Sequence, residues 1–169
     1  MDTKLKGDIA EQAAVLQALK RGWGVLKPVG DRLAYDLVFD VESILVKIQV
    51  KYAWLDVPSG NYVTDNRRTK TNRRLILREA YKQTDFDFAL VYIEKLDLFY
   101  VFPVEIFIGY KSEIHLVETE KRQRKPRSTE YRDAWLLILE WVEERITHLK
   151  ISGILPSSAS TGQTPQKVE

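Results

Sequence analysis

The sequence predicts an α/β fold in which helices pack against a β-sheet. Three observations indicate this fold class: a helical apolar pattern near the N-terminus, five short runs rich in branched and aromatic residues, and a second helical pattern over residues 128–149. The chain has 169 residues, of which 44% are hydrophobic, and this is enough for one domain with a single core.

The N-terminal helix is expected over residues 3–21, because Gly22 and Gly24 follow it and end it. At 3.6 residues per turn, one of its sides is apolar. That side comprises Leu5, Ile9, Ala13, Leu16 and Leu19. A second stripe contains small residues and one carboxylate, namely Gly7, Glu11, Ala14 and Ala18. Small side chains on this stripe would let the helix approach a sheet closely.

Three strands are expected next, over residues 22–29, 32–41 and 44–55, because these runs alternate or are dense in branched residues. Glu42 and Ser43 fall between the second and third runs and predict a hairpin turn. The three strands should therefore form an antiparallel meander.

The middle of the chain, residues 57–84, is polar and basic and predicts a loop with a hairpin tip. Within it, residues 75–81 could form a short helix. Two further strands are expected over residues 86–95 and 96–107, whose aromatic and branched side chains should fill the centre of the sheet.

The last helix is expected over residues 128–149, with Ser128 or Thr129 capping a first turn that contains acidic residues. Its buried side is predicted to hold Trp135, Ile138, Leu139, Val142 and Ile146. The following segment is rich in Ser, Pro, Gly and Thr and is typical of a flexible tail. We therefore divide the chain into a folded domain, residues 1–150, and a flexible C-terminal tail, residues 151–169.

Composition excludes several classes of site. The absence of cysteine removes disulfides, thiolate metal sites and cysteine nucleophiles. With two histidines far apart in the sequence, His115 and His148, the composition argues against a multi-histidine metal centre. No apolar run is long enough for a membrane span or a secretion signal, so we expect a cytoplasmic protein with no membrane partner.

The net charge of +2 hides a strong segregation of charge. Residues 65–74 and 121–127 together carry +9, so the rest of the chain carries −7. Two basic clusters on an acidic body favour binding to a polyanion such as DNA, although most charged runs are only solvated loops. Asn and Thr among the arginines of the first cluster are suited to base edges. The residues expected to contact DNA are Tyr62, Asn66, Arg67, Arg68, Lys70, Asn72, Arg73, Arg74, Lys121, Arg122, Arg124, Lys125 and Arg127.

A polar group is expected on one side of the predicted hairpin. Side chains alternate along a strand, so Gln49 and Lys51 share a surface, and pairing with the preceding strand would bring Asp36 beside Gln49. Glu11, on the small-residue stripe of the first helix, could reach the same place. Carboxylate and amide oxygens are the ligands that Mg²⁺ prefers, and Lys51 could hold an attacking water or stabilise a phosphate.

A simpler interpretation of the same residues stays open at this point. A strand with Lys47, Gln49 and Lys51 on one side can also be a solvated face, and the spacing of the polar residues recurs by chance in many proteins. Asp40 and Glu105 are expected to be solvated or structural charges.

Three segments together resemble the PD-(D/E)XK nuclease superfamily: KGDIAEQAAVLQALKRGWGV, YDLVFDV and VKIQVKYAW. Residues 1 to about 150 closely resemble its cyanobacterial group I intron homing endonuclease. The resemblance implies a restriction-endonuclease-like core, with a mixed central sheet flanked by helices and a basic DNA-contacting loop or hairpin. It also implies the catalytic set Glu11, Asp36, Gln49 and Lys51, of which the first three would hold the metal.

The sequence departs from the superfamily pattern at two positions. Tyr35 stands where a proline usually precedes the aspartate, and this residue has no chemical role. Gln49 replaces an acidic ligand; its amide oxygen can coordinate magnesium but adds no negative charge.

The resemblance implies a Mg²⁺-dependent enzyme that cuts both strands of a long pseudo-palindromic DNA target in intron homing. One chain carries one site, so a double-strand break implies a homo-oligomer, either a dimer or a dimer of dimers. Two alternatives remain: a Holliday junction resolvase of the same superfamily, and a non-catalytic sequence-specific DNA-binding protein.

Overall fold

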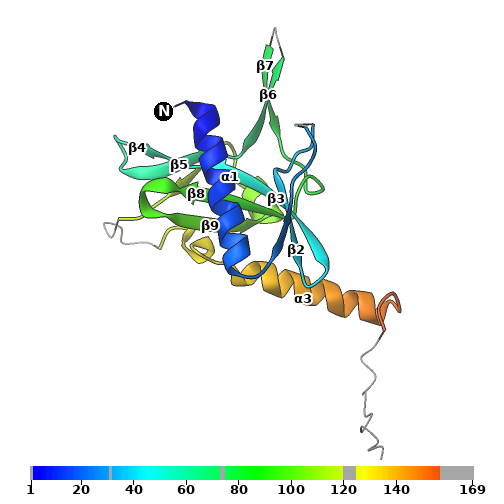
Figure 1. The fold of residues 1–169 in the computed structure, drawn as a ribbon. Coiled ribbons are helices and arrows are strands. Elements are labelled where there is room, and N and C mark those ends of the chain that lie inside the picture. Colours follow the sequence, from blue (N-terminus) through cyan, green and yellow to red (C-terminus); the bar gives the residue numbers. More distant parts are fainter. Residues whose placement is uncertain (1, 31, 73–74, 120–124, 157–169) are drawn as a thin grey trace, which may run out of the picture.

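The computed structural model describes residues 2–30, 32–72, 75–119 and 125–156, except for the side chains of residues 69–72 and 75–77. Its central sheet is built from β1 Gly24–Leu26, β2 Leu37–Val41, β3 Ile44–Tyr52, β8 Phe88–Ile93 and β9 Leu98–Pro103. The strand order is β1-β2-β3-β8-β9 (Figure 1). Strands β3 and β8 are parallel, whereas the other three neighbouring pairs are antiparallel. The mixed central sheet that the sequence predicts is confirmed.

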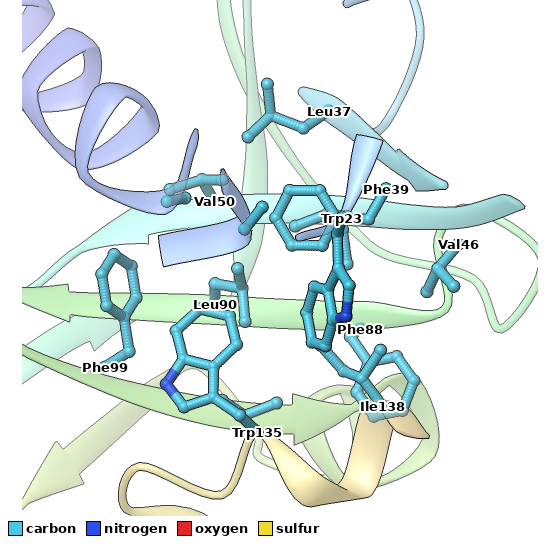
Figure 2. Close-up of a cluster of buried hydrophobic side chains, with 14 of the residues drawn as sticks. Trp23, Leu37, Phe39, Val46, Val50, Phe88, Leu90, Phe99, Trp135 and Ile138 are labelled. Carbon is cyan, nitrogen blue, oxygen red and sulfur yellow. The ribbon is translucent and has the colours of Figure 1, made fainter. Parts of the chain in front are cut away.

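Two helices, α1 Thr3–Lys20 and α3 Leu136–Ile151, pack on one face of this sheet, with α1 lying across the strands (Figure 1). The layer between them and the sheet is aromatic (Figure 2). The Trp23 ring lies 5.8 Å from Phe39 and 6.2 Å from Trp135, measured between ring centroids. Trp141 also packs against this core.

The face that α1 presents to the sheet is its small-residue stripe. Ala10, Ala14 and Ala18 are fully buried, whereas Leu5, Leu16 and Leu19 are about half exposed. The close approach to the sheet that the sequence predicts along the small residues is seen at Ala14 and Ala18, whereas the three leucines of the apolar side stay half exposed. The alanines face the sheet because only short side chains let the helix backbone lie close against β3.

The opposite face of the sheet is covered by a second sheet and a short helix. The second sheet has the order β10-β5-β4, with β10 Glu113–Leu116, β5 Asn61–Asp65 and β4 Trp54–Asp56. Helix α2, Val104–Ile108, contributes Phe107 to a second aromatic core. This is the face on which the alternation of β3 places Gln49 and Lys51.

Strands β6 Arg67–Asn72 and β7 Leu75–Ala80 form an antiparallel ribbon that projects from the body of the protein (Figure 1). The hairpin expected within residues 57–84 thus corresponds to this ribbon. The short helix considered for residues 75–81 is wrong, because β7 pairs with β6 along its whole length.

Every predicted strand is shorter than expected, and three of the predicted elements break at a defined residue. The run 44–55 breaks at Ala53, so that its last residues join the second sheet as β4, and the run 96–107 changes from β9 to α2 after Pro103. The predicted helix over residues 128–149 begins only at Leu136. Asp133 has a left-handed backbone with φ of 51°, which interrupts any helix that starts at Ser128.

The turn between β2 and β3 is the one that the sequence predicts. Glu42 and Ser43 both have positive φ, 51° and 67°, as a tight two-residue hairpin requires. No helix in the described part of the chain combines the length and apolarity that crossing a bilayer requires.

The packing of α1 generates a stability prediction. Ala14→Leu should lower the free energy of unfolding by about 1 to 3 kcal/mol, because the added methylenes have no space between the helix and the sheet. Leu16→Ala, on the exposed side of the same helix, should change it by less than about 1 kcal/mol. Urea unfolding of the two variants measures both values, and equal losses would contradict this packing.

Candidate active site

Pairing of β2 with β3 brings Asp36 beside Gln49. Leu37 lies opposite Ile48 in this register, and the Asp36 N–H donates to the Ile48 carbonyl at 2.9 Å, which continues the ladder by one residue. The Asp36 carboxylate accepts two hydrogen bonds on one oxygen, from the Gln49 amide nitrogen at 2.5 Å and from the Val50 N–H at 2.8 Å. Two of the four predicted site residues are thus in direct contact.

Lys51 lies beside this pair and is partly buried. Its ammonium donates to the main-chain carbonyl of Arg67 at 2.9 Å and lies 5.0 Å from the centre of the Tyr81 ring. Burial lowers the pKa of Lys51 to about 8, although the charges of Asp36 and Asp65 oppose this change. Lys51 is therefore close enough to Asp36 for their charges to interact.

The Asp36 carboxyl is costly to ionise. Its pKa is raised to about 6, mainly by burial and to a smaller extent by the negative charge of Glu11. The hydrogen bond from the Val50 N–H and the positive charges of Lys51 and Arg68 act in the opposite direction. The influence of Glu11 places this helix residue near the strand residues, as the sequence predicts.

Glu11 also has a partner that sequence analysis missed. The Lys27 ammonium lies 3.2 Å from its carboxylate, so an ion pair joins the segment after β1 to α1. No motif or spacing marks Lys27 in the sequence, because the contact depends on how β1 leads the chain past α1.

The donor set fits a hard divalent cation. Glu11, Asp36 and Gln49 supply two carboxylates and an amide oxygen, which are ligands for magnesium. A buried carboxylate with a raised pKa, next to a second carboxylate, is stabilised in its charged form by a bound cation. Among the described residues no three His, Cys, Asp or Glu side chains cluster as metal ligands, and the third oxygen of the predicted set belongs to a neutral amide, that of Gln49.

The basic residues fall into different environments. Arg67 pairs with Asp65, and Arg68 donates to the carbonyls of Arg32 and Leu33. Lys125 lies 3.7 Å from Glu130, and the Arg127 guanidinium lies 4.9 Å from the centre of the Tyr110 ring. The positions that fall outside the described side chains are Lys70, Asn72, Arg73, Arg74, Lys121, Arg122 and Arg124.

Two residues of the expected DNA-contact set are not on the surface. Tyr62 is only 9% exposed in β5, and Asn66 is 4% exposed, with its amide donating to the carbonyls of Phe107 and Tyr110. Both positions precede the ribbon and support its base, so we remove them from the contact set. Asp40 and Glu105 are exposed, as expected for solvated charges.

Comparisons with known proteins agree with this geometry. Residues 1–138 match the PD-(D/E)XK endonuclease family. The chain belongs to this family. A solved structure of a bacterial homing endonuclease, I-Ssp6803I, is similar to it with 66% sequence identity and a TM-score of 0.81, over 86% of this chain and 99% of that one. A search of curated proteins finds no match.

Within the PD-(D/E)XK endonuclease family, the fold explains why the polar group is assembled at this place. The family match spans α1, which carries Glu11, β3, which carries Gln49 and Lys51, and the start of β2, directly after Asp36. The interpretation of these residues as a solvated strand face does not hold, because Gln49 is only 7% exposed and bonds directly to Asp36.

The raised pKa of Asp36 predicts that its charge destabilises the metal-free protein. This cost is present above about pH 6 and absent below the unfolded pKa, near 4, where the carboxyl is protonated in both states. Asp36→Asn should therefore stabilise the metal-free protein by roughly 1 to 3 kcal/mol at pH 8 and by little at pH 3.5. Thermal unfolding at the two pH values tests this; a gain independent of pH would contradict it.

Gln49→Glu should restore the acidic ligand of the family and tighten magnesium binding several-fold, because ligand charge sets affinity in oxygen sites. Gln49→Ala should weaken it. Gln83→Glu adds the same charge at an exposed position and serves as the control. Calorimetric titration of the DNA-free protein gives the three affinities. If Gln49→Glu and Gln83→Glu behave alike, Gln49 is not a ligand.

Proposed function

We propose that this PD-(D/E)XK endonuclease is a site-specific homing endonuclease that cuts both strands of a long pseudo-palindromic DNA target and so supports intron mobility. The observation that carries the proposal is the contact of Asp36 with Gln49, with Lys51 and Glu11 close to it. The 66% identity to a bacterial homing endonuclease supports the choice within the family.

The chemistry assigned to the site is hydrolysis of a phosphodiester. Asp36, Gln49 and Glu11 would hold magnesium, which supplies positive charge for the phosphate and a water of lowered pKa. Lys51 orients the attacking water or stabilises the phosphorane-like transition state from its position beside Asp36. Tyr81 and the Arg67 carbonyl keep the Lys51 ammonium in place until then.

Double-stranded DNA is held by the ribbon. Arg68 on β6 lies near enough to the site for its charge to act on both Asp36 and Lys51. A projecting two-stranded ribbon has the dimensions to enter a major groove, where Asn and Arg side chains distinguish bases. The remaining basic residues of both clusters, in residues 65–74 and 121–127, are also proposed to contact DNA.

The assembly proposed is a homo-oligomer. Each chain supplies one Asp36, one Lys51 and one ribbon, whereas a double-strand break needs two sites of opposite orientation. A symmetric dimer, or a dimer of dimers, provides both sites and doubles the length of duplex that is read. The enzyme would act on DNA in the cytoplasm.

The alternatives are less well supported. A non-catalytic DNA-binding protein has no need of a carboxylate whose burial costs free energy, as that of Asp36 does. A Holliday junction resolvase recognises branched shape, whereas Thr69, Thr71 and Asn72 among the basic residues of the ribbon sequence favour reading of bases.

The test is to incubate the protein with a genomic DNA library and magnesium, and to map the ends that are produced. We expect cuts at one defined duplex site. Lys51→Ala should lower the cleavage rate by at least about 10²-fold while DNA binding stays within a few-fold, because Lys51 acts on the transition state. Cuts at junctions without sequence preference, or equal losses of binding and cutting, would contradict the proposal.

A further inference from the structure

The active-site lysine is bonded to the DNA-contacting ribbon. The Lys51 ammonium donates to the carbonyl of Arg67, and Arg67 is the first residue of β6. The position of Lys51 therefore depends on where the base of the ribbon lies. A hollow of about 340 Å³ opens beside this bond, lined by both residues together with Asp65 and the start of α1.

Asp65, the last residue of β5, fixes that base. Its carboxylate accepts from the Arg67 N–H at 2.9 Å and from the Arg67 guanidinium at 3.0 and 3.2 Å. It also lies 3.4 Å from the guanidinium of Arg78, on the other strand of the ribbon. The Asp65 carboxylate thus connects β6 and β7 to β5. It also binds Arg67, whose carbonyl accepts the hydrogen bond from Lys51.

We propose that Asp65 is a positioning residue for cleavage, which holds the Arg67 carbonyl, and through it the Lys51 ammonium, in the arrangement that cutting requires. In this proposal Asp65 acts through its bonds to Arg67 and Arg78, not on the reacting groups themselves. Its role is to make the geometry of the active site depend on the seating of the ribbon on DNA. This inference rests on the endonuclease function proposed above.

The charges of the group favour this role over simple support of the ribbon. Asp65 neutralises Arg67 and Arg78, two cations that would otherwise be available to DNA phosphates. A residue selected for affinity alone would leave both arginines free. Pairing with Asp65 lowers the electrostatic affinity of these arginines for DNA, but it fixes the position of the Arg67 carbonyl that accepts the hydrogen bond from Lys51.

The variants to compare are Asp65→Ala, which removes every bond, and Asp65→Asn, which keeps an oxygen for the Arg67 N–H. Asp56→Asn is the matched control, since Asp56 bonds to Ser59 within the turn after β4. Single-turnover cleavage at saturating DNA should fall by roughly 10- to 100-fold in Asp65→Ala. It should fall less in Asp65→Asn and not at all in Asp56→Asn, while the Kd for DNA stays equal or becomes lower in both Asp65 variants.

A second measurement is independent of nuclease activity. In the DNA-free protein, acylation of Lys51 by an amine-reactive ester, followed by mass spectrometry, should be faster in Asp65→Ala than in wild type and intermediate in Asp65→Asn. Equal labelling of Lys51 in all variants overturns the inference. So does a loss of cleavage that only matches a loss of DNA affinity. A wild-type protein that cuts no DNA refutes the proposed function instead, and the labelling order still decides the role of Asp65.

Discussion

The site depends on the hydrogen bonds that cross from β2 to β3. The Asp36 carboxylate accepts hydrogen bonds from the Gln49 amide and the Val50 N–H, and the Asp36 N–H donates to the Ile48 carbonyl. Because side chains alternate along a strand, a shift of one residue in this register would turn Gln49 and Lys51 to the opposite face. The two-residue turn at Glu42 and Ser43, with both residues at positive φ, sets the register. A local turn thus determines which groups meet.

This arrangement places an ionisable pair where burial opposes its charges. The pKa of Asp36 is raised and that of Lys51 is lowered, so each charge is disfavoured in the absence of a ligand. Perturbed pairs of this kind are typical of functional sites. The aromatic layers on both faces of the sheet offset the cost, since Phe39, Phe88 and Phe102 are almost completely buried there. The core therefore stabilises a site that is itself destabilising.

Sequence analysis identified the elements that have strong local signals. The hairpin and the proximity of Asp36 and Gln49 follow from alternation and from a two-residue turn, whereas the mixed sheet is implied by the resemblance to PD-(D/E)XK nucleases. On α1, periodicity alone marks the leucines as the apolar side, whereas the burial of Ala10 and Ala14 depends on how closely the helix can approach the sheet. Lys27 meets Glu11 across 16 residues, and Arg78 meets Asp65 from the far strand of the ribbon; both contacts depend on the paths of the segments between them, which no pattern encodes. Asp133 had no local signal for its left-handed turn.

The balance of charge in the site bears on how an enzyme of this family can work with a neutral ligand. Glu11 is paired with Lys27, and Asp36 lies near Lys51, so the two carboxylates face two ammonium groups. Gln49 adds no further negative charge. On the proposed function such a site would attract a divalent cation weakly, and the phosphate of bound DNA would supply the charge that the glutamine lacks. On the proposed function, metal binding and DNA binding therefore strengthen each other, and hydrolysis is confined to molecules already seated on their target.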